Sequence, residues 1–480
     1  MRTWIAACAA VLAGASASAQ EGGDTPEMRA ALAAGYKAAF VCSATFNADR
    51  TFPLIAANEL DLIYPDYREA VARLPGAEIN NEASTVSVTY SADMPPRIAV
   101  WRPGLGCAQL PIGAEPVLAD YVPGFTSWPQ PALPDTNPII GDDAPLTPDL
   151  DAMGRLEAPI DFAFDGRTFG EGTRTSAVVV VKNGRVAAEQ YARGITAETP
   201  QRTWSVAKSL SATIIGAAMH QGLIHVDEEA RLEAWSAPFD PRQKIKVQDL
   251  LHMASGLDSG ERGSRTDRIY FGGASVADHA ATKQLEAAPG SRFKYANNDT
   301  LLAMRALAER FDDKGAYRRF PYESLFLKIG AERTTLETDW RGDFLSSSQV
   351  WTTARDLARI GQLYLQDGVW RGERILPFGW WEWVSAPLGP QPTQGDYGYG
   401  AQFWLIGGID GLPAETFAAL GHRGQHLVIV PSKDVVIVRR GYDESGGAPF
   451  DITAFAATVL KALEPPPPPL EPLEEGEEAR

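Results

Sequence analysis

The chain has few cysteines, no metal-binding histidine pattern and no hydrophobic run of membrane length. Its three cysteines form no Cys-x-x-Cys pair, and its six histidines form no His-Glu-x-x-His segment. The sequence therefore gives no support for a zinc site. No stretch beyond the N-terminus reaches about 18 uninterrupted apolar residues, the length that a membrane-spanning helix needs. We expect no metal, no cofactor and no membrane span.

Positive charge is also in short supply. The 480 residues hold 44 Lys and Arg against 61 Asp and Glu, a formal net charge of −17. Nucleic acids and anionic membranes both select proteins with a basic face, so neither is an expected partner. Because 45% of the residues are hydrophobic, the chain can bury one large core or two moderate ones.

The two ends of the chain have the composition of processing and solvent-exposed segments. The N-terminus predicts a signal peptide over 1–19, cleaved after Ala19. It has a positively charged beginning, the apolar run Trp4–Gly14 and a small-x-small cleavage site that ends at Ala19. We therefore expect a periplasmic or secreted protein. At the other end, a proline run followed by glutamates predicts a disordered tail over 464–480.

The two cysteines outside the predicted signal peptide are Cys42 and Cys107. Both lie in a small N-terminal unit, 20–110, and in an exported chain a pair of cysteines favours a disulfide. Two buried free thiols are the alternative. A Pro-rich passage with little periodicity follows and predicts a linker over 111–154.

The main domain is predicted over 155–463. A hairpin pattern at its start, Ser176–Tyr191 with Asn183-Gly184 at the turn, is matched by a second pair of strands near its end, His426–Arg440. The sequence between them is mostly helical. We expect an α/β (α+β) fold in which these strands share one antiparallel sheet flanked by helices, with a mostly helical lobe and the site between the two parts.

The segment Thr203–Ser209 holds a candidate nucleophile and base. Ser205 and Lys208 are three residues apart at the start of a small, apolar helix, so both side chains lie on one face. An amine whose pKa is lowered by burial can take the serine proton. Helix N-terminal N–H groups also favour negative charge beside Ser205. The alternative is an N-cap serine and a surface lysine.

Two further motifs carry groups that suit acyl transfer. Tyr295 and Asn297 open a predicted helix; the tyrosine can relay a proton and the asparagine amide can hold a substrate carbonyl. The segment His422–Gln425 precedes a strand, where glycine permits close approach and the following N–H can complete an oxyanion hole.

Taken in order, Ser205-x-x-Lys208, Tyr295-x-Asn297 and His422-x-Gly424 resemble the motifs of the serine β-lactamase and penicillin-binding-protein superfamily. The chain is most similar to the class C β-lactamase, carboxypeptidase and esterase branch, and within it to 6-aminohexanoate-dimer hydrolases. The flanking segment Leu250–Leu257 is similar as well. The resemblance covers about 160 to 463 and implies a β-lactamase-like fold, with the N-terminal unit as an extension.

The resemblance also implies roles for single residues. Ser205 would be acylated, Lys208 would be its base, and Tyr295 would relay protons. Asn297 would position substrate, and the N–H groups of Ser205 and Gln425 would form the oxyanion hole.

Two of the implied assignments leave alternatives open. Tyr270 would contact a leaving amide, or else be a loop aromatic. Most members of the branch have Lys-Thr-Gly at the third motif, where the lysine helps to hold a substrate carboxylate. Here the residues are His422, Arg423 and Gly424; Arg423 can supply a positive charge, and some carboxypeptidases have a histidine-led version of this motif.

We therefore expect an exported serine hydrolase that cleaves amide or ester bonds of small substrates. One alternative is a D-alanyl-D-alanine carboxypeptidase or a class C-like β-lactamase. Another, from a different class, is a catalytically silent binder of peptides or muropeptides. The natural substrate and the oligomeric state do not follow from the sequence.

Overall fold

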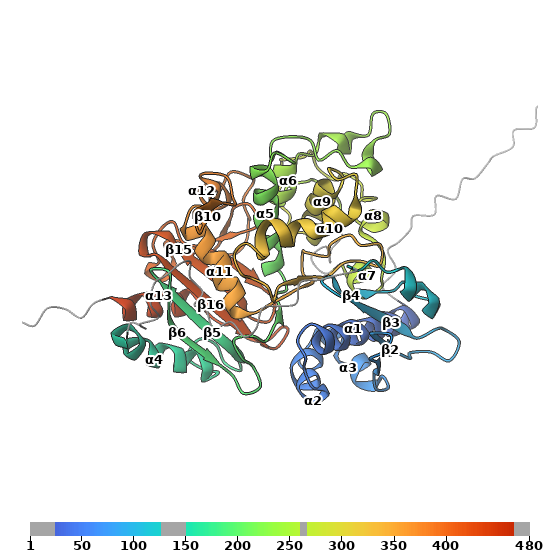
Figure 1. Cartoon of the computed structure of the whole chain (residues 1–480), viewed down its shortest axis with the longest axis horizontal. Coiled ribbons are helices and arrows are strands. Elements are labelled where there is room, and N and C mark those ends of the chain that lie inside the picture. The colour runs from blue at the N-terminus through green and yellow to red at the C-terminus, as the bar shows by residue number, and fades with distance from the viewer. Residues whose placement is uncertain (1–24, 126–149, 260–265, 465–480) are drawn as a thin grey trace, which may run out of the picture.

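The structure is a computed structural model that describes residues 25–125, 150–259 and 266–464 (Figure 1). The predicted signal peptide, most of the predicted linker and nearly all of the predicted tail lie outside these residues. The linker is entered by a short 3₁₀ turn, Pro116–Tyr121, and helix α4, Leu150–Phe164, begins before the expected start of the main domain.

The central sheet has seven strands in the order β12-β13-β14-β15-β16-β5-β6, all antiparallel. Strand β5 lies directly against β16, with Lys182 opposite Val435 and Val178 opposite Arg439. The expected pairing of the first and last hairpins in one sheet is confirmed. The strands are β5 (Thr175–Lys182), β6 (Arg185–Tyr191), β12 (Gly398–Tyr399), β13 (Trp404–Leu405), β14 (Phe417–Gly421), β15 (Gln425–Val430) and β16 (Val435–Gly441).

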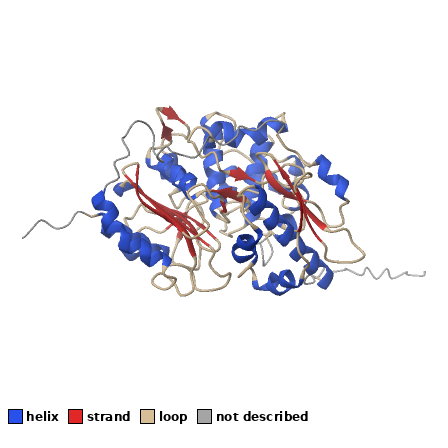
Figure 2. Cartoon of the chain, turned by 60° about the horizontal axis from the view of Figure 1, so that its bottom comes forward, coloured by secondary structure: helices blue, strands red, loops and turns tan. Residues whose placement is uncertain are grey.

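Helices cover both faces of this sheet, which explains why its central strands are continuously apolar (Figure 2). Successive side chains of a strand point to opposite faces. Val178 and Val180 pack in one core with α4 and α13 (Ile452–Leu463), whereas Val179 and Val181 face the core that holds α11 (Ala354–Leu365). Each valine is fully buried, and such burial stabilises the fold by about 1.5–3 kcal/mol per side chain.

The second lobe is mostly helical, as expected. Between the two hairpins the chain forms, among others, the helices Val247–Leu251, Asn297–Ala308 and Ala354–Leu365. The elements of this part are β7 (Gln201–Arg202), α5 (Val206–His220), α6 (Val247–Leu251), α7 (Asp267–Tyr270), α8 (Val276–His279), α9 (Asn297–Ala308), α10 (Lys314–Pro321), a π-helical turn (Tyr322–Phe326), β8 (Thr335–Leu336), β9 (Val350–Thr352), β10 (Val369–Trp370), β11 (Glu373–Arg374) and α12 (Trp380–Val384). Short 3₁₀ turns lie at Glu233–Trp235, Pro241–Lys244, Ile409–Gly411 and Pro431–Lys433.

The N-terminal unit is built on one long helix and a small sheet. Helix α1 packs across the four-stranded sheet β1-β2-β3-β4. Thr25 caps the helix by accepting a hydrogen bond from the N–H of Met28. The elements are α1 (Pro26–Phe46), α2 (Phe52–Ile55), a π-helical turn (Ala56–Leu60), α3 (Pro65–Arg73), β1 (Glu78–Asn80), β2 (Thr85–Val88), β3 (Arg97–Arg102) and β4 (Gly106–Gln109).

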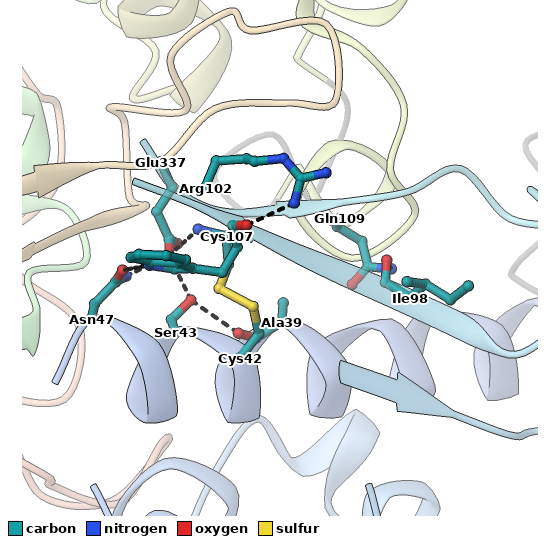
Figure 3. Close-up of a disulfide and its surroundings, with 10 residues drawn as sticks. Ala39, Cys42, Ser43, Asn47, Ile98, Arg102, Cys107, Gln109 and Glu337 are labelled. Carbon is teal, nitrogen blue, oxygen red and sulfur yellow. Dashed lines mark hydrogen bonds between the residues drawn. A yellow bond between two sulfur atoms is a disulfide. The ribbon is translucent and has the colours of Figure 1, made fainter. Parts of the chain in front are cut away.

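A disulfide joins Cys42 of α1 to Cys107 of β4 (Figure 3). Beside it, the carboxylate of Glu337 accepts hydrogen bonds from Ser43 Oγ at 2.6 Å, Asn47 Nδ2 at 2.9 Å and the Cys107 N–H at 3.1 Å. Glu337 follows strand β8 of the main domain, so this buried carboxylate links the two parts of the chain. Burial raises its pKa to about 7.

The N-terminal unit also shares a hydrophobic core with the main domain. Tyr36 and Phe40 of α1 are buried and lie against Phe271, and Phe40 lies 5.7 Å from the ring of Trp204. At Gly35 an added Cβ would come within 2.0 Å of the Phe271 carbonyl oxygen, so the helix lies in direct backbone contact with the end of α7. The main domain and the N-terminal unit are therefore packed as one body.

Candidate active site

Ser205 lies at a sharp turn between strand β7 and helix α5. Trp204, just before it, adopts φ 50°, a left-handed conformation that costs a non-glycine residue about 1–3 kcal/mol. Ser205 is the N-cap of α5, but its hydroxyl makes no capping hydrogen bond. Lys208 is only 1% exposed. This geometry differs from a capping serine with a surface lysine, because the hydroxyl remains available and the amine is buried.

The Lys208 amine meets three oxygen atoms. Its Nζ lies 3.2 Å from Ser205 Oγ, 2.8 Å from the carbonyl oxygen of Ser347, and in a short contact with Asn297 Oδ1. Burial lowers the pKa of Lys208 to about 7, because desolvation disfavours the ammonium form.

These contacts fix the orientation of a neutral amine. Asn297 Oδ1 and the Ser347 carbonyl can only accept, so they take its two N–H groups. The remaining lone pair then faces Ser205, whose hydroxyl can donate to it. This arrangement suits a general base that activates the serine.

Tyr295 lies just before α9. Its ring centroid lies 5.0 Å from Lys208 Nζ, and the Ser205 side chain is near enough to lower its pKa. Its ring stacks on Trp404 at 5.5 Å. Burial raises the pKa of Tyr295 far above its usual range, more than the Ser205 side chain lowers it. The phenol is therefore protonated at neutral pH and holds a proton that it can pass on.

Asn297 is brought to the site, but its amide faces the base. Oδ1 accepts from Lys208, and Nδ2 donates to Thr266 Oγ1 at 3.0 Å. The sequence predicted a group that positions substrate, whereas this geometry orients the lysine. Tyr270, on α7, also lies close: its hydroxyl is hydrogen-bonded to Ser347 Oγ, and burial raises its pKa to about 12.

The third motif forms the turn between β14 and β15. Gly421 pairs with Gln425 across it, and an added Cβ at Gly421 would lie 2.4 Å from the Thr203 carbonyl oxygen and 3.2 Å from Ser205 N. The turn therefore lies against the backbone of the candidate nucleophile. Within the described residues, the Ser205 N–H has no backbone acceptor. That N–H is free to contribute to an oxyanion hole, together with the backbone of the turn.

Gly424 permits a buried ion pair behind this turn. It has φ 76°, and an added Cβ would fall 1.7 Å from Arg439 Nη1 and 2.2 Å from Asp443 Oδ2. Arg439 and Asp443 form a buried ion pair at 2.7 Å. The Gln425 side chain is likewise held, accepting from Arg440 Nε at 2.7 Å and donating to the Arg423 carbonyl oxygen at 3.1 Å.

Arg423 does not fit the expected role of a cation for substrate. It is 4% exposed, and its guanidinium donates to the carbonyl oxygens of Asn58, Asp61 and Asp443 at 2.8–2.9 Å. With φ 59°, the residue turns its side chain toward the N-terminal unit. These carbonyl groups occupy the guanidinium, so that a substrate carboxylate would have to replace them in order to bind it.

His422 lies in an aromatic cluster beside the serine. Its ring stacks on Tyr64 with centroids 4.9 Å apart and meets Trp204 edge-on at 4.9 Å. Arg202 lies over the Trp204 ring, with its guanidinium carbon 3.8 Å from the ring centroid.

Sequence reasoning missed three residues of this site, Ser347, Thr266 and Tyr64. Ser347 and Thr266 contact Lys208 and Asn297 from loops distant in sequence. The run of serines at 346–348 was the one available signal, and it has no periodicity or motif. Tyr64 comes from the N-terminal unit, which lies outside the family resemblance.

Other features of the described residues do not compete with this site. A cavity of about 510 Å³ lies in the N-terminal unit between α1, α3 and the end of β2, and none of the candidate site residues lines it. Across residues 25–125, 150–259 and 266–464, no cluster of three His, Cys, Asp or Glu side chains has a metal-binding arrangement. In the same ranges no helix combines the length and apolarity needed to cross a membrane.

A serine, a buried lysine and a tyrosine that lie close together between an antiparallel sheet and a helical lobe have the arrangement of a serine hydrolase. The chain belongs to the β-lactamase family, because the family model named Beta-lactamase matches residues 162–439, more than half of the sequence. The predicted superfamily and β-lactamase-like fold are thereby confirmed.

Individual proteins are also similar to this chain. A 6-aminohexanoate-dimer hydrolase from Paenarthrobacter ureafaciens is 29% identical over 324 residues, covering 62% of this chain and 79% of the relative. Among solved structures, a putative 6-aminohexanoate-dimer hydrolase from Bacillus anthracis has a TM-score of 0.51 at 23% identity, covering 60% of this chain and 78% of that one. A putative β-lactamase from Bacteroides dorei has a TM-score of 0.52 at 18% identity, with 64% and 97% covered.

Proposed function

We propose that this serine hydrolase cleaves amide or ester bonds of small substrates through an acyl-enzyme on Ser205. The observation that carries the proposal is the Lys208 amine, which is buried, has two acceptors for its N–H groups and lies within hydrogen-bond distance of Ser205 Oγ. The similarity to a 6-aminohexanoate-dimer hydrolase supports a linear amide as one substrate class.

In the first half-reaction the Ser205 proton passes to Lys208 Nζ while Oγ bonds to the substrate carbonyl carbon. The N–H groups of Ser205 and Gln425 would hold the resulting oxyanion. Tyr295 then donates its proton to the leaving amine or alkoxide, and Lys208 returns a proton to Tyr295. The carbonyl–leaving-group bond breaks and leaves an acyl ester on Ser205.

In the second half-reaction water attacks that ester. Its proton passes to the Tyr295 and Lys208 pair, and the ester oxygen regains a proton as Ser205. The products are a carboxylic acid and the free enzyme. Asn297 and Ser347 hold the lysine throughout, so that the amine gains and then gives up a proton without changing position.

The position of Arg423 bears on the alternatives. A carboxypeptidase or β-lactamase of this branch needs a cation for the substrate carboxylate, and the arginine that would supply it is bound to backbone carbonyls. An uncharged substrate group is therefore favoured. A silent binder has no need of a buried lysine. Burying the Lys208 amine removes it from water and lowers the stability of the fold, and binding alone gives no reason for that cost.

The test is intact-protein mass after incubation with a p-nitrophenyl ester, a linear 6-aminohexanoate dimer and a fluorescent penicillin. We expect an acyl adduct and turnover with the ester and the dimer. Ser205→Ala should lose both, whereas Ser209→Ala, which removes a buried hydroxyl one helical turn away, should keep them. Equal turnover by Ser205→Ala would refute the proposal, and a persistent penicillin adduct would instead indicate a penicillin-binding carboxypeptidase.

We also propose that the protein is exported. Disulfides persist mainly in oxidising compartments, and the chain has one between Cys42 and Cys107. The mass of the protein isolated from its native host tests this proposal. Loss of residues 1–19 is the expected result, and an intact N-terminus would contradict it.

A further inference from the structure

The N-terminal unit is fastened to the active-site turn by the residue that was expected to bind substrate. Arg423 donates to the carbonyl oxygens of Asn58 and Asp61, in the π-helical turn and just after it. The guanidinium is nearly fully buried, so these hydrogen bonds are shielded from water. The third motif therefore holds the segment that precedes α3.

The loop after β16 holds the same segment from another direction. The Ser445 N–H donates to the Leu62 carbonyl oxygen at 2.9 Å, and Glu444 pairs with Arg68 at 2.9 Å. Leu62 has φ 53° and Pro65 begins α3, so the backbone on both sides of Tyr64 is constrained. The position of the Tyr64 ring is thus set by contacts with the main domain.

The ring of Tyr64 lies in the aromatic cluster next to Ser205. It stacks on His422 with an interplanar angle of 15°, and it meets Trp204, the residue before the serine, edge-on at 5.7 Å. Tyr36 and Tyr67 of the same unit are buried, at 0% and 2% exposure, whereas Tyr64 is only partly buried. Part of Tyr64 therefore remains exposed.

We propose that Tyr64, supplied by the N-terminal unit, is a specificity-determining residue that contacts the acyl group of the substrate. This inference rests on the proposed function of Ser205 and extends it to the substrate class. The rings of His422 and of the buried Trp204, which directly precedes Ser205, form one aromatic cluster with the tyrosine. Because Arg423 is bound to backbone carbonyls, it supplies no cation for an acidic group, and the part of the substrate recognised here is the apolar methylene chain of the acyl group.

The first test compares two esters. The ratio of kcat/KM for p-nitrophenyl hexanoate to that for p-nitrophenyl acetate is measured in the full-length protein and in Tyr64→Ala. We expect the ratio to fall about tenfold, since removal of an apolar contact surface changes discrimination between acyl chains by that order. Tyr64→Phe, which keeps the ring, and Tyr121→Ala, which removes a tyrosine that is 74% exposed, should leave the ratio unchanged.

A ratio is chosen because a structural defect lowers both rates by the same factor. If Tyr64→Ala reduces activity toward the two esters equally, Tyr64 only supports the fold and the inference is overturned. The same holds if Tyr64→Phe alters the ratio as much as Tyr64→Ala, since the hydroxyl and not the ring would then be responsible.

A second measurement does not depend on catalysis. Binding of N-butylhexanamide and N-butylacetamide to Ser205→Ala is compared by calorimetry with binding to the Ser205→Ala, Tyr64→Ala double variant. A preference for the longer acyl chain that is lost with Tyr64 supports the inference even if no ester acylates Ser205, an outcome that would refute the proposed function alone. An unchanged preference overturns the inference about Tyr64.

Discussion

The pH dependence of acylation follows directly from the buried lysine. Lys208 acts as a base only when neutral, and its pKa of about 7 means that half of the protein is competent near neutral pH. Below that value the competent fraction falls about tenfold per pH unit. We therefore expect the acylation rate to level off above about pH 8 and to drop to roughly one hundredth of its maximum at about pH 5.

Single-turnover kinetics with p-nitrophenyl acetate measure this step, because the release of nitrophenol reports acylation before the acyl-enzyme is hydrolysed. Two buried carboxyl groups, Asp299 and Glu337, also have pKa values raised to about 7, so their titration falls in the same pH range as that of Lys208. Glu337→Gln is the matched control, since it removes a group with the same pKa at the disulfide, away from the serine. A flat profile between about pH 5 and pH 8, or a profile that moves with Glu337→Gln, would refute the assignment of the base.

The same lysine gives a second readout that needs no substrate. Its folded-state pKa lies below its unfolded value of 10.5, so the folded protein binds fewer protons between these values. The free energy of unfolding should therefore rise with pH from about 7 to 10.5, by at most about 5 kcal/mol from this group. Lys208→Met should remove that part of the pH dependence, and an equal slope in the variant would contradict the lowered pKa.

Two further predictions concern stability and are read by denaturant unfolding. Gly424→Ala should destabilise the protein by about 3 kcal/mol or more, because the added Cβ enters the Arg439–Asp443 ion pair. Gly408 has φ 81° and open space around it, so Gly408→Ala should show only the cost of the left-handed backbone. Equal losses of stability in the two variants would contradict the argument. Replacing Cys42 and Cys107 by alanine should cost about 4 kcal/mol, because the disulfide closes a loop with a sequence separation of 65, and unchanged stability would show that the loop is restrained without it.

The local parts of the site could be predicted from the sequence. Residues three apart on a helix lie on one face, so the spacing alone places Ser205 and Lys208 together. The apolar composition of α5 indicates that this helix is buried. The pairing of β5 with β16 followed from two hairpin patterns at the ends of the domain. In each case a short-range pattern fixes the geometry.

The parts that could not be predicted depend on contacts between distant segments. The direction of the Arg423 side chain depends on a left-handed backbone and on carbonyl groups more than 300 residues away. The Asn297 amide turns to Lys208 because Thr266 takes its nitrogen. Neither partner is marked in the sequence, so residue type alone favoured a substrate-binding role for both.

The order of strands in the central sheet has a consequence for how the protein is made. Strand β16 is the last to leave the ribosome, yet it lies between β15 and β5, and β5 precedes it by about 250 residues. A nascent or truncated chain that ends before Val435 exposes the open edges of both neighbours, and open edges promote aggregation. Folding must then wait for a contact of very long sequence separation, which makes it slow and all-or-none. Shortened products of this chain should therefore be recovered as aggregates, with no smaller active enzyme among them.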